Sequence, residues 1–167
     1  ERLLEHEALE ESAERLHLLD RLGEATRSMT EATEIMAVTA RMLGEHLGVV
    51  RCAYADVESD NDRFTIRSDW SREGVASSVG VYSLDLFGPQ ATENLRHGRR
   101  VVVRDVDREL GDEGGGRMFN AIGIKAIITA PLVKQGRLVA MMAVHESKPR
   151  DWTEKEISIV DEVVERC

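Results

Sequence analysis

The sequence predicts an α+β domain, in which a central, mostly antiparallel sheet carries the N- and C-terminal helices packed on one of its faces. Apolar residues recur with helical spacing near the two ends of the chain, over 1–48 and 153–167, and alternate with polar residues between them. Within the alternating part, pairs of strands are separated by short polar turns, as in β-hairpins. Terminal helices that flank antiparallel strands are typical of this fold class.

Residues 1–48 contain no proline and are expected to be helical, with a break and a new N-cap near Thr30. An apolar stripe in the first helix recurs at spacings of four, three and three residues, with glutamates beside it. This pattern favours a coiled coil, so we expect residues 1–22 to form a signalling helix that pairs with a second copy. The alternative is a helix packed on its own domain. The stripe consists of Leu9, Ala13, Leu16 and Leu19.

The middle of the chain is expected to contain two hairpins, with a short helix and a short strand between them. The turn of the second hairpin is Gln135-Gly136, and a proline begins the short helix. The expected strands cover 49–57, 63–70, 100–104, 124–133 and 137–146, and the short helix covers 89–97.

The last helix is expected to begin at a capping box formed by Thr153 and Glu156. A second apolar stripe follows and reaches the end of the sequence, so we expect this exit helix, about 153–167, to run on past the last residue. Residues 23–165 are then the domain between the two terminal helices. The stripe of the exit helix, which is expected to join the dimer interface, consists of Ile157, Val160 and Val164.

Charge and composition exclude several classes of protein. The formal net charge is −9, and residues 1–34 alone hold ten acidic and four basic residues, a net of −6. No basic stripe is present, which argues against a nucleic-acid partner. No apolar run is long enough to insert into a membrane. Two widely separated cysteines, Cys52 and Cys167, do not make a disulfide framework, so a reducing cytoplasm is expected.

Three segments of the chain together resemble the GAF family. They are residues 95–105 (LRHGRRVVVRD), residues 131–139 (PLVKQGRLV) and the start of the last helix at 152–154 (WTE). GAF domains are small sensory and regulatory modules of histidine kinases, phytochromes, phosphodiesterases and transcriptional regulators. The resemblance covers about residues 20–165 and implies a fold with a central sheet and a ligand pocket beneath crossing loops.

A closer resemblance is to the GAF module of bacterial two-component sensor histidine kinases, including the HWE type. It rests on residues 18–23 (LLDRLG), 51–57 (RCAYADV) and 145–153 (HESKPRDWT). It implies a non-catalytic input domain whose helices continue into a PAS or kinase module. We therefore expect a cytoplasmic homodimer that relays a ligand or partner signal through its terminal helices, and no enzymatic activity in this chain.

A pocket for an unidentified small molecule is expected over the sheet. By strict alternation, Cys52, Tyr54 and Asp56 share one face of the first strand, and Phe64 and Trp70 share one face of the second. A few polar groups over an apolar floor would suit a small ligand, although the same aromatic residues could simply fill the core. The candidate pocket residues are Tyr54, Trp70, Phe87, Arg104, Asp105, Phe119 and His145.

Other GAF chemistries stay open as alternatives: a bilin- or haem-binding photoreceptor or gas sensor, or a GAF-fold enzyme. No His or Cys occurs between Arg99 and Arg137, where the resemblance to phytochromes would place a bilin-holding residue, so no covalent bilin is expected. His145 could contact a ligand or be a hydrogen-bonded histidine at a strand end. The cofactor, if there is one, is not identified by the sequence.

Overall fold

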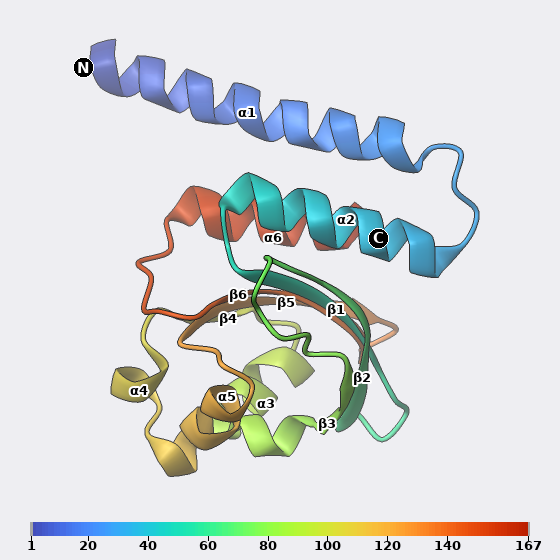
Figure 1. Ribbon diagram of the computed structural model, residues 1–167, viewed down its shortest axis with the longest axis vertical. Coiled ribbons are helices and arrows are strands. Elements are labelled where there is room, and N and C mark those ends of the chain that lie inside the picture. The colour runs from blue at the N-terminus through green and yellow to red at the C-terminus, as the bar shows by residue number, and fades with distance from the viewer. Residues whose placement is uncertain (1, 167) are drawn as a thin grey trace.

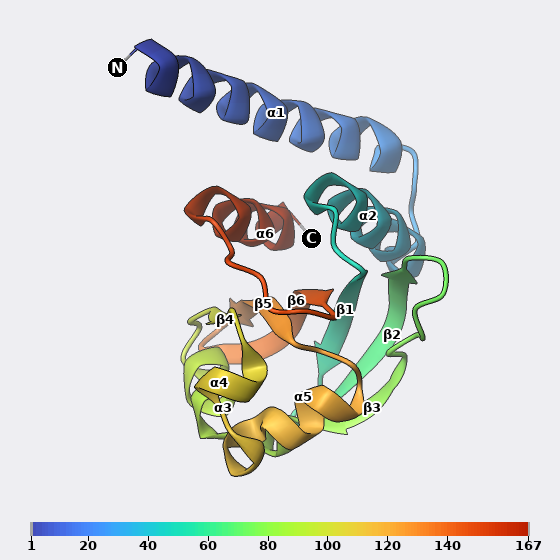
Figure 2. The same ribbon diagram turned by 60° about the vertical axis from the view of Figure 1, so that its left-hand side comes forward.

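The computed structural model describes residues 2–166, with side chains from Leu4 to Arg166, as a layered α+β fold (Figure 1). Helices α2 and α6 cover one face of a six-stranded sheet, α1 lies on these two helices, and the short helices lie on the other face (Figure 2). The elements are α1 (Arg2–Thr26), α2 (Ala32–Leu47), β1 (Arg51–Val57), β2 (Arg63–Ser71), β3 (Gly80–Ser83), η1 (Leu84–Phe87), α3 (Pro89–Arg96), β4 (Val101–Val103), α4 (Val106–Glu109), η2 (Asp112–Gly116), α5 (Arg117–Ala121), β5 (Ala126–Lys134), β6 (Arg137–Glu146) and α6 (Glu154–Arg166).

The strand order is β3-β2-β1-β6-β5-β4, and every neighbouring pair is antiparallel. The two predicted hairpins are β1–β2 and β5–β6, and they meet where β1 pairs with β6 at the centre of the sheet. The predicted fold class is therefore confirmed, with the N- and C-terminal helices on the same face.

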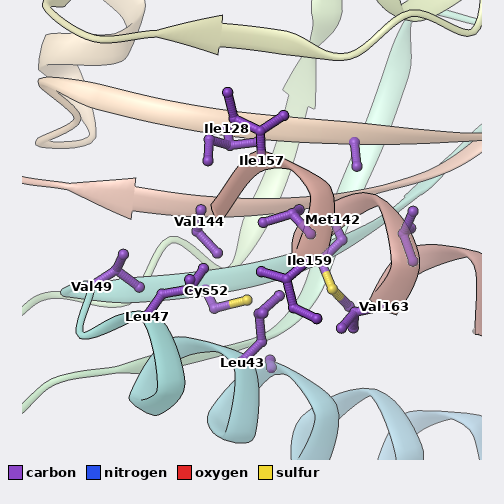
Figure 3. Packing of buried hydrophobic residues seen from close by; sticks show 14 of the residues in the cluster. Leu43, Leu47, Val49, Cys52, Ile128, Met142, Val144, Ile157, Ile159 and Val163 are labelled. Atoms are coloured by element: carbon purple, nitrogen blue, oxygen red, sulfur yellow. The ribbon is translucent and has the colours of Figure 1, made fainter. Parts of the chain in front are cut away.

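The core on this face is formed by apolar side chains of α2 and α6 above β1, β5 and β6 (Figure 3). Leu43 and Leu47 of α2 and Ile159 and Val163 of α6 point toward Met142 and its neighbours on the sheet. Burying such side chains removes a large apolar area from water, which is the main force holding helix layer and sheet together.

The side chains that α1 buries against the domain lie in its C-terminal part. Leu18, Leu19 and Leu22 are buried, whereas Leu9 and Leu16 are 70% and 55% exposed. Before Leu18, the contacts of α1 with α6 include two surface ion pairs, Arg15 with Glu162 and Lys155 with Glu11, a kind of contact that stabilises a fold only weakly.

Only part of the two apolar stripes predicted for dimerisation is exposed. Leu19 and the stripe of α6 (Ile157, Val160 and Val164) are buried in the core of their own domain, so here the alternative of packing within the domain holds. Leu9, Ala13 and Leu16 remain exposed. None of the helices in residues 2–166 is both long and apolar enough to cross a lipid bilayer.

Candidate ligand site

A cavity of about 60 Å³ lies on the face of the sheet opposite α2 and α6, between the sheet and the short helices. It is almost entirely apolar, as small-molecule sites usually are. Its walls come from five strands, from η1 and α3, and from the segment around α5. They are formed by Ala53, Ala55, Phe64, Ile66, Leu84, Phe87, Ala91, Leu95, Val101, Phe119, Ile122, Ile124, Ile127, Thr129, Met141, Ala143 and His145.

The side chains that cover the sheet beneath the cavity are short, because small residues of adjacent strands are paired at its centre. Ala53 of β1 is directly opposite Ala143 of β6, and Thr129 of β5 is opposite Ala143 on the other side. Ala143 keeps accessible surface although it lies in a central strand. A methyl group there does not reach the opposite wall, which leaves the space open.

The opposite wall depends on aromatic packing and on a close crossing of two backbone segments. The rings of Phe87 and Phe119 meet edge to face, with their centroids 4.9 Å apart. Beside them, Gly88 and Gly115 have φ values of 96° and 111°, and a Cβ on either would lie 2.0 Å from a carbonyl oxygen of the other segment. Only glycine allows both this backbone conformation and this approach.

The polar end of the cavity is built around Arg51 and His145, which are paired across β1 and β6. Both side chains are buried. Arg51 Nε donates a hydrogen bond to His145 Nδ1 at 2.8 Å, and its two Nη atoms donate to the carbonyl oxygens of Ala76 and Ile122 at 2.9 Å and 2.6 Å. Arg51 thus ties two surface segments to the sheet.

Burial, followed by the neighbouring Arg51 charge, holds the pKa of His145 well below its ordinary value. Because the guanidinium can only donate, Nδ1 must be the acceptor. His145 is therefore neutral near pH 7, with its proton on Nε2. Burial also lowers the pKa of Arg51, but guanidinium groups remain charged at neutral pH.

Three of the seven predicted pocket residues, Phe87, Phe119 and His145, line the cavity together. Tyr54 and Trp70 do not, because they contact the core on the helix side of the sheet. The prediction that Trp70 shares a face with Phe64 is wrong, since a β-bulge makes Arg67 an extra residue between Ile66 and Ser68. The side chains of β2 beyond the bulge therefore point to the other face.

The remaining two candidates, Arg104 and Asp105, lie near the end of β4 and take part in local contacts. Arg104 Nε donates to Asp151 at 3.0 Å, and its Nη2 donates to the carbonyl oxygen of Trp152 at 3.0 Å. The side chain of Asp105 caps α4 by accepting from the Arg108 backbone N–H. Neither side chain borders the cavity.

Residues that shape the site but were missed include Ala53, Ala143, Thr129 and Arg51. The alanines carry a weak signal, because small residues recur on one face of strands that are otherwise built from larger ones. Arg51 gives no such signal, since a charged residue at the start of a strand is ordinarily solvated.

No thiol chemistry is available at the cavity within the described residues. Cys52 is not part of the cavity wall and is buried in the helix-side core (Figure 3). Among residues 2–166, no group of three or more His, Cys, Asp or Glu side chains is arranged to hold a metal ion.

Known structures with the same fold include bilin-binding domains. The chain is similar to the phycocyanobilin-bound and phycoerythrobilin-bound GAF domains of a cyanobacterial phytochrome, with 21% and 22% identity and a TM-score of 0.78 for both. These alignments cover 91% and 93% of this chain and 90% and 93% of the other chains.

The chain is also similar to free methionine-R-sulfoxide reductase from Neisseria meningitidis, with 16% identity, a TM-score of 0.71, and coverage of 90% of this chain and 84% of the reductase. At such identities the likenesses show the fold alone. No curated protein matches the sequence. The model of the GAF domain family matches residues 31–167, and the chain therefore belongs to the GAF family.

Proposed function

We propose that this chain is a non-catalytic sensory domain that binds a small molecule in the cavity and relays the event through its terminal helices. The observation that carries the proposal is the cavity itself, which has alanines on its floor and a buried, fixed histidine at one end. A domain that only mediated dimerisation would gain stability from larger side chains at Ala53 and Ala143, because filling a void restores lost packing contacts.

The strands β5 and β6 connect the cavity to the helices. Thr129 and Ala143 face the cavity, while their chain neighbours Ile128 and Val144 belong to the core beneath α6. A ligand that moves these strands by a fraction of an ångström must therefore repack α6, because a dense core does not absorb such a shift.

The parent protein that we propose is a cytoplasmic two-component sensor histidine kinase, with a PAS or kinase module after α6 and a parallel homodimer formed through α1. Support comes from the resemblance of residues 18–23, 51–57 and 145–153 to such proteins and from the exposed stripe of α1. The test is autophosphorylation of the full-length protein, which should differ between the wild type and an Ala143→Val variant that fills the cavity. Equal rates, or no kinase activity, would contradict this assignment.

A bilin-binding photoreceptor domain is the second candidate, and the likeness to the two bilin-bound cyanobacterial domains favours it. The residues present do not fit the group in this conformation. About 60 Å³ is far too small for an open-chain tetrapyrrole, and no cysteine lines the cavity. A haem does not fit either, for the same reason of size. Co-expression with bilin-producing enzymes tests this candidate, which requires a visible absorption band in the purified protein.

The cavity is tested directly with xenon, which enters dry apolar cavities. Xenon should shift the amide NMR signals of Ala53, Ala143 and Phe119 in the wild type. In the Ala143→Val variant these shifts should be lost. A matched Val81→Ala variant, altered at an exposed position on β3, should retain them. A wild type without xenon-dependent shifts would contradict a ligand site here.

A further inference from the structure

His145 presents one polar hydrogen to an otherwise apolar cavity. Its Nδ1 is occupied by Arg51, and no described residue accepts a hydrogen bond from its Nε2. The buried polar side-chain atoms that are sealed off without any partner, within residues 4–166, are Ser71 Oγ and Asn120 Oδ1. Nε2 is not among them, so a water-sized molecule can reach it. His145 lines the cavity, and Nε2–H is the ring donor that remains after Nδ1 is engaged by Arg51.

A second polar group lies on the same face of the neighbouring strand. His145 is opposite Ile127 on β5, and Thr129 is two residues further along the same face of that strand. Diagonal neighbours of this kind have Cα atoms about 7–8 Å apart. The Thr129 side chain is buried and also lines the cavity. One small molecule can therefore contact both groups.

The size of the cavity limits the ligand. An engineered cavity of about 150 Å³ holds benzene. The present cavity, at about 60 Å³, has room for a smaller molecule. A compact aliphatic molecule of about five non-hydrogen atoms is the upper limit if the walls adjust slightly.

The charges around the site favour a neutral ligand. Arg51 is a cation in contact with His145, but it is not a wall residue and already donates to His145 and to two backbone carbonyls. A buried carboxylate would have one N–H and one hydroxyl as polar partners and no direct counter-ion, an arrangement whose desolvation cost is not recovered. The Arg51 charge does polarise the imidazole, which makes Nε2–H a better donor to a neutral acceptor.

We propose that the cavity selects a small uncharged carbonyl compound, a short ketone or aldehyde, whose oxygen accepts from His145 Nε2–H while its carbons lie against Ala53 and Ala143. This inference rests on the proposed function, in which the cavity is the ligand site, and adds the chemical class of the ligand.

The experiment compares 2-butanone, n-pentane and propionate, which have the same number of non-hydrogen atoms, by NMR titration of protein labelled with nitrogen-15. 2-Butanone should move the Nε2–H resonance of His145, whereas n-pentane should bind without moving it. In His145→Phe, the dissociation constant of 2-butanone divided by that of n-pentane should rise by about threefold or more, because that variant lacks the donor.

Two further measurements keep the test decisive. Val81→Ala is the matched control, since it alters an exposed position on β3 outside the cavity wall and should leave the response of His145 Nε2–H to 2-butanone in place. If His145→Phe does not fold, the imidazole resonances of the wild type still decide the question, because the hydrogen bond is observed there directly.

The remaining outcomes separate this inference from the proposed function. Binding of 2-butanone and n-pentane without any response of His145 would overturn the inference and leave the cavity as a ligand site. Tighter binding of propionate than of 2-butanone would overturn the choice of a neutral ligand. No binding of any probe, together with no effect of xenon, would overturn the proposed function and this inference with it.

Discussion

Gly44 on α2 is the residue over which the indole of Trp70 packs. A Cβ on Gly44 would lie 2.4 Å from Trp70 Cε3, well inside the contact distance of two carbons. We therefore expect Gly44→Ala to lower the free energy of unfolding by about 1–3 kcal/mol, as overpacking of a core does. The control is Gly23→Ala on α1, where nothing lies within 4 Å of the new methyl group. It should raise the free energy by about 0.5–1 kcal/mol through helix propensity. Urea unfolding measures both, and equal effects would contradict the packing argument.

The buried imidazole of His145 makes stability depend on pH. Burial and Arg51 lower its pKa in the folded state, whereas the unfolded chain titrates near 6.5. The unfolded state therefore binds the proton more readily, so the contribution of this group is complete above pH 6.5 and is lost as the pH falls below it. The expected slope is about 1.4 kcal/mol per pH unit for one proton.

Urea unfolding at pH 7.5, 6.5 and 5.5 measures this slope. His145→Gln, which keeps an acceptor for Arg51, should show a shallower decline than the wild type. His46, whose pKa is also lowered chiefly by burial, contributes in the same direction, so His145→Gln should not abolish the decline. Parallel curves for wild type and variant would show that His145 titrates normally in the folded state.

The errors in the predicted pocket arise from single residues. Strict alternation places Phe64 and Trp70 on one face, but the extra residue at Arg67 reverses the direction of every later side chain in β2. A bulge leaves no clear mark in a sequence whose polar and apolar residues still alternate. Alternation correctly puts Tyr54 on the same face as Cys52, but it does not say which face carries the helices, and both residues lie on the helix side and not at the cavity.

At the scale of elements, the same spacing of apolar residues occurs in two helices whose apolar faces have different environments. The stripes of α1 and α6 have nearly the same spacing, yet that of α6 packs in its own core and the stripe at Leu9, Ala13 and Leu16 faces solvent. A helix records in its sequence that it has an apolar face, and not which partner covers that face. The terminal helices could therefore be predicted, whereas their partners required the structure.

The exposed stripe of α1 predicts a dimer that depends on two leucines. A double variant, Leu9→Glu and Leu16→Glu, should weaken self-association at least about tenfold, because it places charges in an apolar helix seam. Light scattering coupled to size-exclusion chromatography measures the change. The matched control, Val81→Glu with Leu86→Glu, adds the same charge at equally exposed apolar positions on β3 and η1 and should leave the association unchanged. A wild type that is monomeric at high concentration would contradict the prediction.

At the scale of the whole molecule, the sheet separates the cavity from the terminal helices, and alternation within β5 and β6 places neighbouring residues on both sides. A larger side chain that permanently fills the cavity should then have the same effect on the helices as a bound ligand. We expect Ala143→Val to change the free energy of unfolding by less than about 1.5 kcal/mol, because the added methyl groups enter existing space. It should nevertheless alter amide hydrogen exchange in α6 and in the buried end of α1 at Leu18–Leu22, beyond the strands that it touches.

Hydrogen exchange with mass spectrometry distinguishes this coupling from a local effect. Xenon added to the wild type should change exchange in the same segments, and xenon added to Ala143→Val should change nothing further. The short edge strand β3 and helix α4 serve as internal references, because neither contributes a residue to the cavity wall. Changes confined to β5, β6 and α5 would mean that the helix-side core absorbs the disturbance. In that case the terminal helices carry no signal from the cavity, however well the cavity binds its ligand.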